Sequence, residues 1–157
     1  MSLASVRAWV AAHAPDLAII EGHGSTATVA DAAATLGVEP GRIAKTIALK
    51  VGEKTLLLVT RGDARLDNLK CKAAFGGRIR MLDPDATFAA TGHVVGGVCP
   101  FGLATPLPVY TDVSLRAFAT VFPAAGSRTA SLEITPERLA ELTHATWVDC
   151  CTLPQAG

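Results

Sequence analysis

The residues best suited to do chemistry lie in an uncharged stretch rich in glycine and proline, residues 91–108. It holds four of the fourteen glycines and three of the nine prolines of the chain. Glycine lets a ligand approach backbone N–H groups closely, and proline stiffens the chain that follows. Residues 96–100 are therefore predicted to present successive amides to a cavity, as an anion or oxyanion site does. A tight structural crossover between two elements is the other interpretation.

Two side chains could contribute to such a site. Lys45 directly precedes an apolar run at residues 46–49. A cation there could pair with a phosphate or polarise a carbonyl, or it could simply extend into water. Cys99 lies inside the glycine-rich stretch, where it is either small apolar filler or a nucleophile that needs a base such as His93. The four histidines lack metal-ligand spacing, so no metal or other cofactor is predicted.

A third feature is a local excess of positive charge between residues 61 and 80. This segment has six basic residues against two acidic ones in a chain whose formal net charge is zero. The cluster is either a solvated face or a surface that contacts phosphates during transient RNA docking. The residues predicted to contact RNA are Arg61, Arg65, Lys70 and Lys72.

Composition limits the class of protein. With 157 residues, half of them hydrophobic and 18% charged, the chain is expected to form one domain spanning residues 1–157 with a substantial core. Neutral charge argues against tight nucleic-acid binding by the whole surface. No signal peptide or membrane span is expected, and four cysteines without a C-x-x-C pair suit a reducing cytoplasm.

Helices and strands must position these candidates. The pattern predicts helices over residues 2–13, 29–36, 66–75 and 135–142, with Asp83-Pro84 capping another helix. Residues 46–51 and 54–60 are predicted to form a hairpin around Gly52-Glu53. Shorter strands are expected at 17–20, 79–82, 107–111, 121–122, 131–134 and 146–148. This mixed order favours an α+β fold over a regular βαβ winding.

Several of these residues follow one another as they do in a known family. In chain order they are Ala44-Lys45-Thr46, R-G-D-A-R-L-D at 61–67, T-G-x-x-x-G-G-x-x-P-x-G at 91–102, and Asp112 after an apolar strand. This series resembles the YbaK/ProX family of aminoacyl-tRNA deacylases, which also occurs as the editing insertion of bacterial prolyl-tRNA synthetases. The resemblance implies a mixed, mostly antiparallel, partly barrel-like sheet with helices packed around it.

The resemblance also implies a function. Free-standing relatives hydrolyse the ester between a wrong amino acid and tRNA, chiefly tRNA(Pro), so aminoacyl-tRNA and a transient complex with prolyl-tRNA synthetase are the implied partners. Lys45 would bind the phosphate of the terminal adenosine or the reacting carbonyl region. Backbone amides of Gly96 and Gly97 would hold the scissile carbonyl while water or a group of the substrate attacks. The implied substrate-binding residues are Thr28, Thr46, Val98, Cys99, Pro100, Ala124, Gly126 and Ser131.

The sequence departs from relatives that remove cysteine. Those relatives tend to carry an aromatic residue and a tyrosine in the segment that here spans residues 19–28, where this chain has mostly small or aliphatic residues. They also tend to carry Ser-Gly-Gly and a following Asp, where this chain has Ala124-Ala125-Gly126 and Ser131, and Cys99 occupies a position that is commonly serine or proline. Alanine, cysteine and serine therefore all stay open as the amino acid removed.

Two other functions remain compatible with the same residues. A catalytically silent module could dock on tRNA or a synthetase through the basic cluster without accelerating hydrolysis. Alternatively, Cys99 and His93 could form a cysteine-nucleophile hydrolase.

Overall fold

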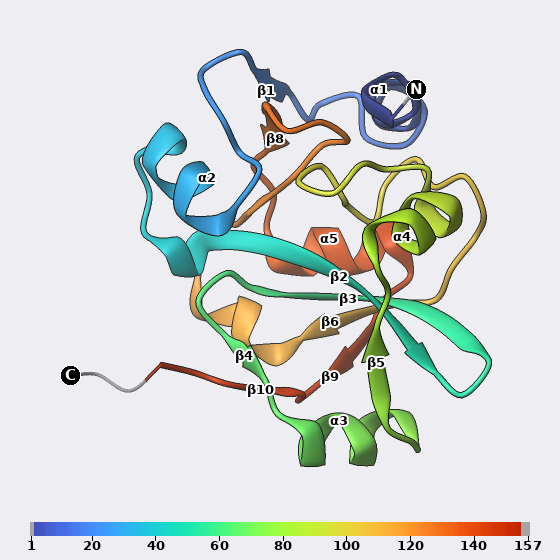
Figure 1. Cartoon of the computed structure of the whole chain (residues 1–157). Coiled ribbons are helices and arrows are strands. Elements are labelled where there is room, and N and C mark those ends of the chain that lie inside the picture. Colours follow the sequence, from blue (N-terminus) through green and yellow to red (C-terminus); the bar gives the residue numbers. More distant parts are fainter. Residues whose placement is uncertain (1, 155–157) are drawn as a thin grey trace.

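The computed structural model describes residues 2–154, arranged as helices on both sides of a central sheet (Figure 1). The helices are α1 (Ser2–His13), α2 (Val29–Leu36), α3 (Asn68–Phe75), α4 (Pro84–Thr91) and α5 (Pro136–Thr143), with 3-10 turns at Pro40–Arg42 and Val113–Ala117. The strands are β1 (Ile19–Glu21), β2 (Ile43–Val51), β3 (Lys54–Arg61), β4 (Arg65–Leu66), β5 (Ile79–Met81), β6 (Val109–Asp112), β7 (Phe122–Pro123), β8 (Ala130–Leu132), β9 (Thr146–Val148) and β10 (Cys151–Thr152).

Local sequence signals account for most of these boundaries. The predicted hairpin is confirmed: β2 and β3 are joined by Gly52-Glu53, and Val51 pairs with Lys54 next to the turn. The predicted caps are also confirmed, since Asp83 accepts a hydrogen bond from the N–H of Ala86, and the hydroxyl of Thr135 does the same for Arg138. Such a cap stabilises a helix by roughly 1 kcal/mol.

The six-stranded sheet has the order β5-β2-β3-β6-β9, with β7 beside β2. β2 is antiparallel to β3 and to β5, whereas β3–β6, β6–β9 and β2–β7 are parallel pairs. The α+β class is confirmed, but the sheet is not closed into a barrel, and it is more parallel than expected. The reason lies in the connections, because long crossovers that contain helices return the chain in the same direction. β1–β8 and β4–β10 form two small antiparallel sheets.

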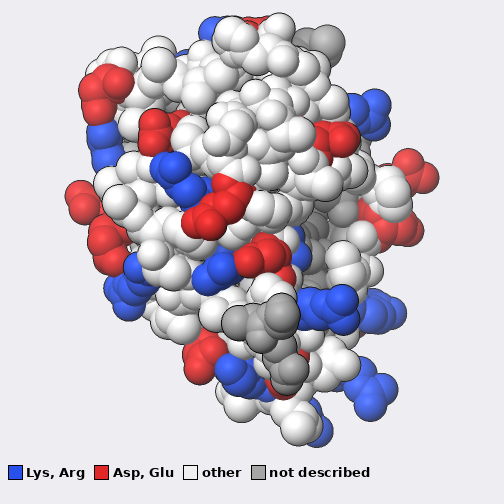
Figure 2. All heavy atoms as spheres, turned by 90° about the vertical axis from the view of Figure 1, so that its left-hand side faces the viewer, with Lys and Arg blue, Asp and Glu red and all other residues white. Residues whose placement is uncertain are grey.

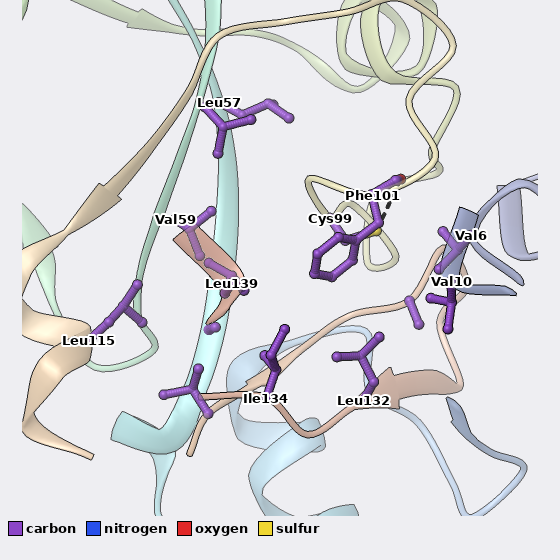
Figure 3. Close-up of a cluster of buried hydrophobic side chains, with 14 of the residues drawn as sticks. Val6, Val10, Leu57, Val59, Cys99, Phe101, Leu115, Leu132, Ile134 and Leu139 are labelled. Atoms are coloured by element: carbon purple, nitrogen blue, oxygen red, sulfur yellow. Dashed lines mark hydrogen bonds between the residues drawn. The ribbon is translucent and has the colours of Figure 1, made fainter. Parts of the chain in front are cut away.

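Side chains of β2 alternate between two cores on opposite faces of the sheet. Ala44 and Ala48 belong to the first core, which α1, α5 and the glycine-rich stretch complete through residues such as Val6, Leu139 and Phe101 (Figure 3). Leu49 belongs to the second core. That core lies toward α3, β4 and β10, below the sheet in Figure 1. Sequence neighbours on β2 therefore serve different faces.

Asp112, the last residue of β6, ties two distant segments together. It is 1% exposed, and its carboxylate accepts the N–H of Cys150 at 2.7 Å and that of Ser114 at 3.0 Å. Asp112→Ala leaves both donors without their acceptor, so the free energy of unfolding should fall by about 2–4 kcal/mol in urea titration. Glu53→Ala in the exposed hairpin turn is the control and should change it by less than about 0.5 kcal/mol. Equal stability of the two variants would contradict this role for Asp112.

Candidate active site

A gap in the central sheet opens one edge of β2. Along that edge, β7 pairs with Ile43 and Ala44, and β5 pairs with Leu49–Val51. Between these partners no strand of the described residues lies along this edge of β2, and the carbonyl of Ala48 instead accepts the N–H of Leu82 at 3.1 Å. Hydrogen-bonded and non-hydrogen-bonded pairs alternate along the hairpin, starting from the Val51–Lys54 pair beside the turn, so Thr46 and Val59 form a non-hydrogen-bonded pair. The N–H and C=O of Thr46 therefore point away from β3 and into the gap.

A cavity of about 320 Å³ lies at this gap. Its walls come from the start of α2, from β2, from the segment between β5 and α4, from the glycine loop (residues 94–100), and from residues near β7 and β8. Among the described residues that line it, Lys45 is the one with a charged side chain, and no Asp, Glu, His or Cys lines it. The predicted site residues that line the cavity are Thr28, Lys45, Thr46, Gly96, Val98, Ala124 and Ser131.

Lys45 was expected to point toward the glycine loop, but it points to the other face of the sheet. Its Nζ donates a hydrogen bond to the carbonyl oxygen of Ala64 at 2.7 Å, and Ala64 belongs to the second core, whereas the glycine loop packs in the first. Burial lowers the pKa of the Lys45 ammonium, and nearby Cys151 and Asp63 oppose that shift. Lys45 still lines the cavity because it occupies the open edge of the strand.

The glycine loop supplies one candidate amide rather than two. The N–H of Gly97 donates to the carbonyl of Val94 at 2.9 Å, and the carbonyl of Gly97 accepts the N–H of Gly126 at 3.0 Å. The expected role of the Gly97 amide as a ligand donor therefore does not fit. Gly96 lines the cavity, has a φ of +93° that favours glycine, and donates no backbone hydrogen bond within the described loops and turns.

Four predicted site residues are buried and do not line the cavity: Gly97, Cys99, Pro100 and Gly126. A Cβ atom on Gly97 would lie 2.6 Å from the backbone N of Ser127, and one on Gly126 would lie 2.6 Å from the carbonyl O of Ser2. Backbone therefore packs directly on backbone here, a contact that only glycine permits.

Cys99 is part of the core, as Figure 3 shows beside Phe101. Burial raises the pKa of its thiol to about 12. Nε2 of His93 lies 3.6 Å from the Cys99 sulfur, but it also lies 2.7 Å from the carbonyl oxygen of Phe101. Because only an N–H can donate to a carbonyl, Nε2 carries the proton, and Nδ1 accepts from the hydroxyl of Ser2 at 2.7 Å. No free ring nitrogen is left to deprotonate Cys99.

Cys99→Ala should consequently leave deacylation within about 3-fold of wild type, while removal of the buried sulfur costs about 1–2 kcal/mol of stability. Single-turnover kinetics and thermal unfolding measure the two effects separately. A loss of activity greater than 100-fold in a folded Cys99→Ala protein would restore the nucleophile hypothesis.

Comparison with known proteins decides the family. Residues 23–142 match the aminoacyl-tRNA editing domain family. The chain belongs to this family. It is an aminoacyl-tRNA hydrolase, and the resemblance seen in the sequence is confirmed.

Two curated relatives match this editing domain over most of their lengths. This chain is 46% identical over 153 residues to YwhH of Bacillus subtilis, and the match covers 96% of this chain and 98% of YwhH. It is 33% identical over 135 residues to EbsC of Enterococcus faecalis, covering 84% and 80% of the two chains. The name of EbsC gives Cys-tRNA(Pro) and Cys-tRNA(Cys) as its candidate substrates.

Solved structures agree with this family. The editing domain superposes with a TM-score of 0.88 on a crystal structure described as a candidate trans-editing enzyme for prolyl-tRNA synthetase, at 32% identity and with 96% and 97% of the chains covered. The crystal structure of APE2540 gives a TM-score of 0.87 at 30% identity, with 94% and 99% covered.

The four basic residues predicted to contact RNA fall into two groups. Arg61 makes two hydrogen bonds to Asp63, at 2.5 and 2.8 Å, lies over the ring of Phe118, and has a side chain only 15% exposed. These contacts hold the Arg61 side chain against the protein, so it is not available for the RNA contact that was expected. Arg65 and Lys72 are exposed, and Lys70 pairs with Asp149 at 3.2 Å. Figure 2 shows Lys and Arg side chains over the lower part of its face, at the height of α3 and β4 in Figure 1.

Two negative findings concern the described part of the editing domain. Within residues 2–154, no group of three or more His, Cys, Asp or Glu side chains could hold a metal ion. Over the same residues, no helix is long and apolar enough to cross a bilayer.

Proposed function

We propose that this chain is a free-standing, single-domain deacylase that works in trans in the cytoplasm, hydrolysing tRNA(Pro) charged with alanine, serine or cysteine. The observation that carries the proposal is the cavity at the open edge of β2, which is about 320 Å³ in volume and lined mainly by apolar residues, many of them small. The name of EbsC and the description of the trans-editing crystal structure support tRNA(Pro) as the substrate. A transient complex with prolyl-tRNA synthetase would deliver it.

Part of the proposal is that the ester lies between Gly96 and the edge of β2. The N–H of Gly96 would donate to the oxyanion that forms when the carbonyl is attacked, and one such donor contributes roughly 3 kcal/mol. The attacking group would be water or a ribose hydroxyl of the substrate, because no nucleophilic Cys and no carboxylate among the described residues lines the cavity. An aminoacyl ester is already activated, so positioning can supply much of the rate.

Lys45 needs one movement to take part. Its ammonium binds a neutral carbonyl, that of Ala64, and a phosphate or a developing oxyanion is a stronger partner for a cation. We infer that substrate draws the Lys45 ammonium around the open edge of β2, where it binds the phosphate of the terminal nucleotide or the reacting carbonyl. Thr28, Thr46, Val98, Ala124 and Ser131 would surround the amino acid, and Arg65, Lys70 and Lys72 would contact the tRNA more remotely.

A panel of charged tRNAs tests the proposed function. Ala-, Ser- and Cys-tRNA(Pro) are incubated with a catalytic amount of protein, with Pro-tRNA(Pro), Ala-tRNA(Ala) and Cys-tRNA(Cys) as counter-substrates. The expected result is hydrolysis of at least one mischarged tRNA(Pro) more than 100-fold faster than in buffer, with Pro-tRNA(Pro) spared. Binding of mischarged tRNA without acceleration would instead identify a catalytically silent tRNA- or synthetase-binding module.

A further inference from the structure

Three residues that line the cavity carry a hydroxyl group with no hydrogen-bond partner within the described residues: Thr26 Oγ1, Thr46 Oγ1 and Ser131 Oγ. All three oxygens are buried, and the whole residues Thr26 and Ser131 are only 8% and 2% exposed. Buried polar groups are nearly always paired, so an unpaired one calls for a specific explanation. Three of them around one cavity point to a ligand that hydrogen-bonds there.

The three hydroxyls come from separate segments whose backbones are fixed independently. The N–H of Thr26 donates to the carbonyl of Arg128 at 2.7 Å. Ser131 is the central residue of β8, and Thr46 lies on β2 at the gap, on the same face as Ala44 and Ala48. None of these positions depends on the hydroxyl itself. Thr28, by contrast, already uses its hydroxyl to cap α2.

The other residues of the cavity wall are mostly apolar, so hydrogen bonds from side chains are concentrated at the three hydroxyl groups. Other residues of the lining include Ala27, Ala44, Val98 and Ala124, which offer no side-chain hydrogen bond. A hydroxyl both donates and accepts, so it can pair with another hydroxyl. An alanine side chain makes no such bond, and a thiol makes only a weak one.

We propose that Thr26, Thr46 and Ser131 form a hydroxyl-recognition site by which the enzyme selects seryl esters over alanyl and cysteinyl esters. The inference rests on the proposed function, because it places the amino acid of the ester in this cavity. A site built to bond a substrate hydroxyl discriminates strongly against an analogue without it, since its own polar groups are then left unpaired.

The test compares hydrolysis of Ser- and Ala-tRNA(Pro) with binding of two stable amide analogues, 3′-seryl- and 3′-alanyl-amino-3′-deoxyadenosine. Wild-type protein should prefer serine by about 10-fold or more in both assays. Thr46→Val and Ser131→Ala remove a hydroxyl with little change of shape, and each should bring the Ser/Ala ratio to within about 3-fold of unity while alanine binding is kept. Thr26→Val should shift the ratio in the same direction.

Thr111→Val is the matched control, because the hydroxyl of Thr111 is also buried and has no partner among the described residues, but Thr111 does not line the cavity. Its Ser/Ala ratio should equal that of wild type. A wild-type protein without preference for serine would overturn the inference. So would variants that lose serine and alanine binding together, because the hydroxyls would then bind the α-amino group common to both. Selective binding of the seryl analogue without hydrolysis of any tRNA would support the inference while the proposed function failed.

Discussion

Replacing Lys45 by alanine should lower kcat/KM for mischarged tRNA(Pro) by about 100- to 1,000-fold, the usual effect of removing one group that stabilises developing charge. Lys45 is the one charged residue among the described cavity-lining residues, so no neighbouring cation can replace it there. Lys45→Met should be equally impaired, because it keeps most of the side-chain length and removes the charge. The measurement is the rate of amino acid release from charged tRNA under single-turnover conditions.

Lys54→Ala is the control for this prediction. Lys54 is exposed at the far end of the same hairpin and is remote from the cavity lining, so its loss should leave the rate within about 2-fold of wild type. Wild-type rates in both Lys45 variants would show that the Ala64-bound ammonium is purely structural. The proposed movement of Lys45 would then be wrong.

Gly97→Ala should have the second-largest effect, although the Gly97 amide touches no substrate in this account. The added Cβ would lie 2.6 Å from the N of Ser127 and 2.8 Å from the C of Gly126, and both are backbone atoms that cannot swing away. The glycine loop must shift, and Gly96 shifts with it. A displacement of about 1 Å can cost 100-fold in rate, so a similar loss of kcat is expected, together with about 1–3 kcal/mol of stability.

Gly77→Ala provides the comparison for Gly97→Ala. A Cβ there would meet only the end of the Val51 side chain, at 3.1 Å, and Gly77 has no positive φ. Kinetics on the two variants at a temperature where both are folded, as monitored by circular dichroism, separate loop geometry from stability. Unchanged kcat in a folded Gly97→Ala protein would mean that the loop does not position a reacting group.

Much of the local structure follows from sequence signals. Asp83-Pro84, Thr135-Pro136 and Gly52-Glu53 place helix starts and a hairpin without any tertiary information. The two-residue strands β4 and β10 were not predicted, because so short a segment has no periodicity and exists only through its pairing partner. The parallel pairs of the central sheet likewise depend on long crossovers rather than on local pattern.

The residues of the site were predicted in part, and the wrong predictions concern contacts that form only in the folded chain. The cavity does bring together Lys45, Thr46, Gly96 and Ser131 from separate segments. The direction of Lys45 was missed because both faces of β2 are apolar, as Ala48 and Leu49 show, so the pattern does not say which face the glycine loop covers. The use of the Gly97 amide inside the loop, and the pairing of Arg61 with Asp63, are contacts that only the folded chain reveals.

The most direct test of the cavity as the active site is an NMR titration of the protein with 3′-seryl- or 3′-alanyl-amino-3′-deoxyadenosine. We expect saturable shifts that are largest at the backbone amides of Thr46 and Gly96, which face the gap in the sheet and the cavity. Shifts that are largest in α3 and β4, or no saturable shift with either analogue, would contradict the cavity as the active site.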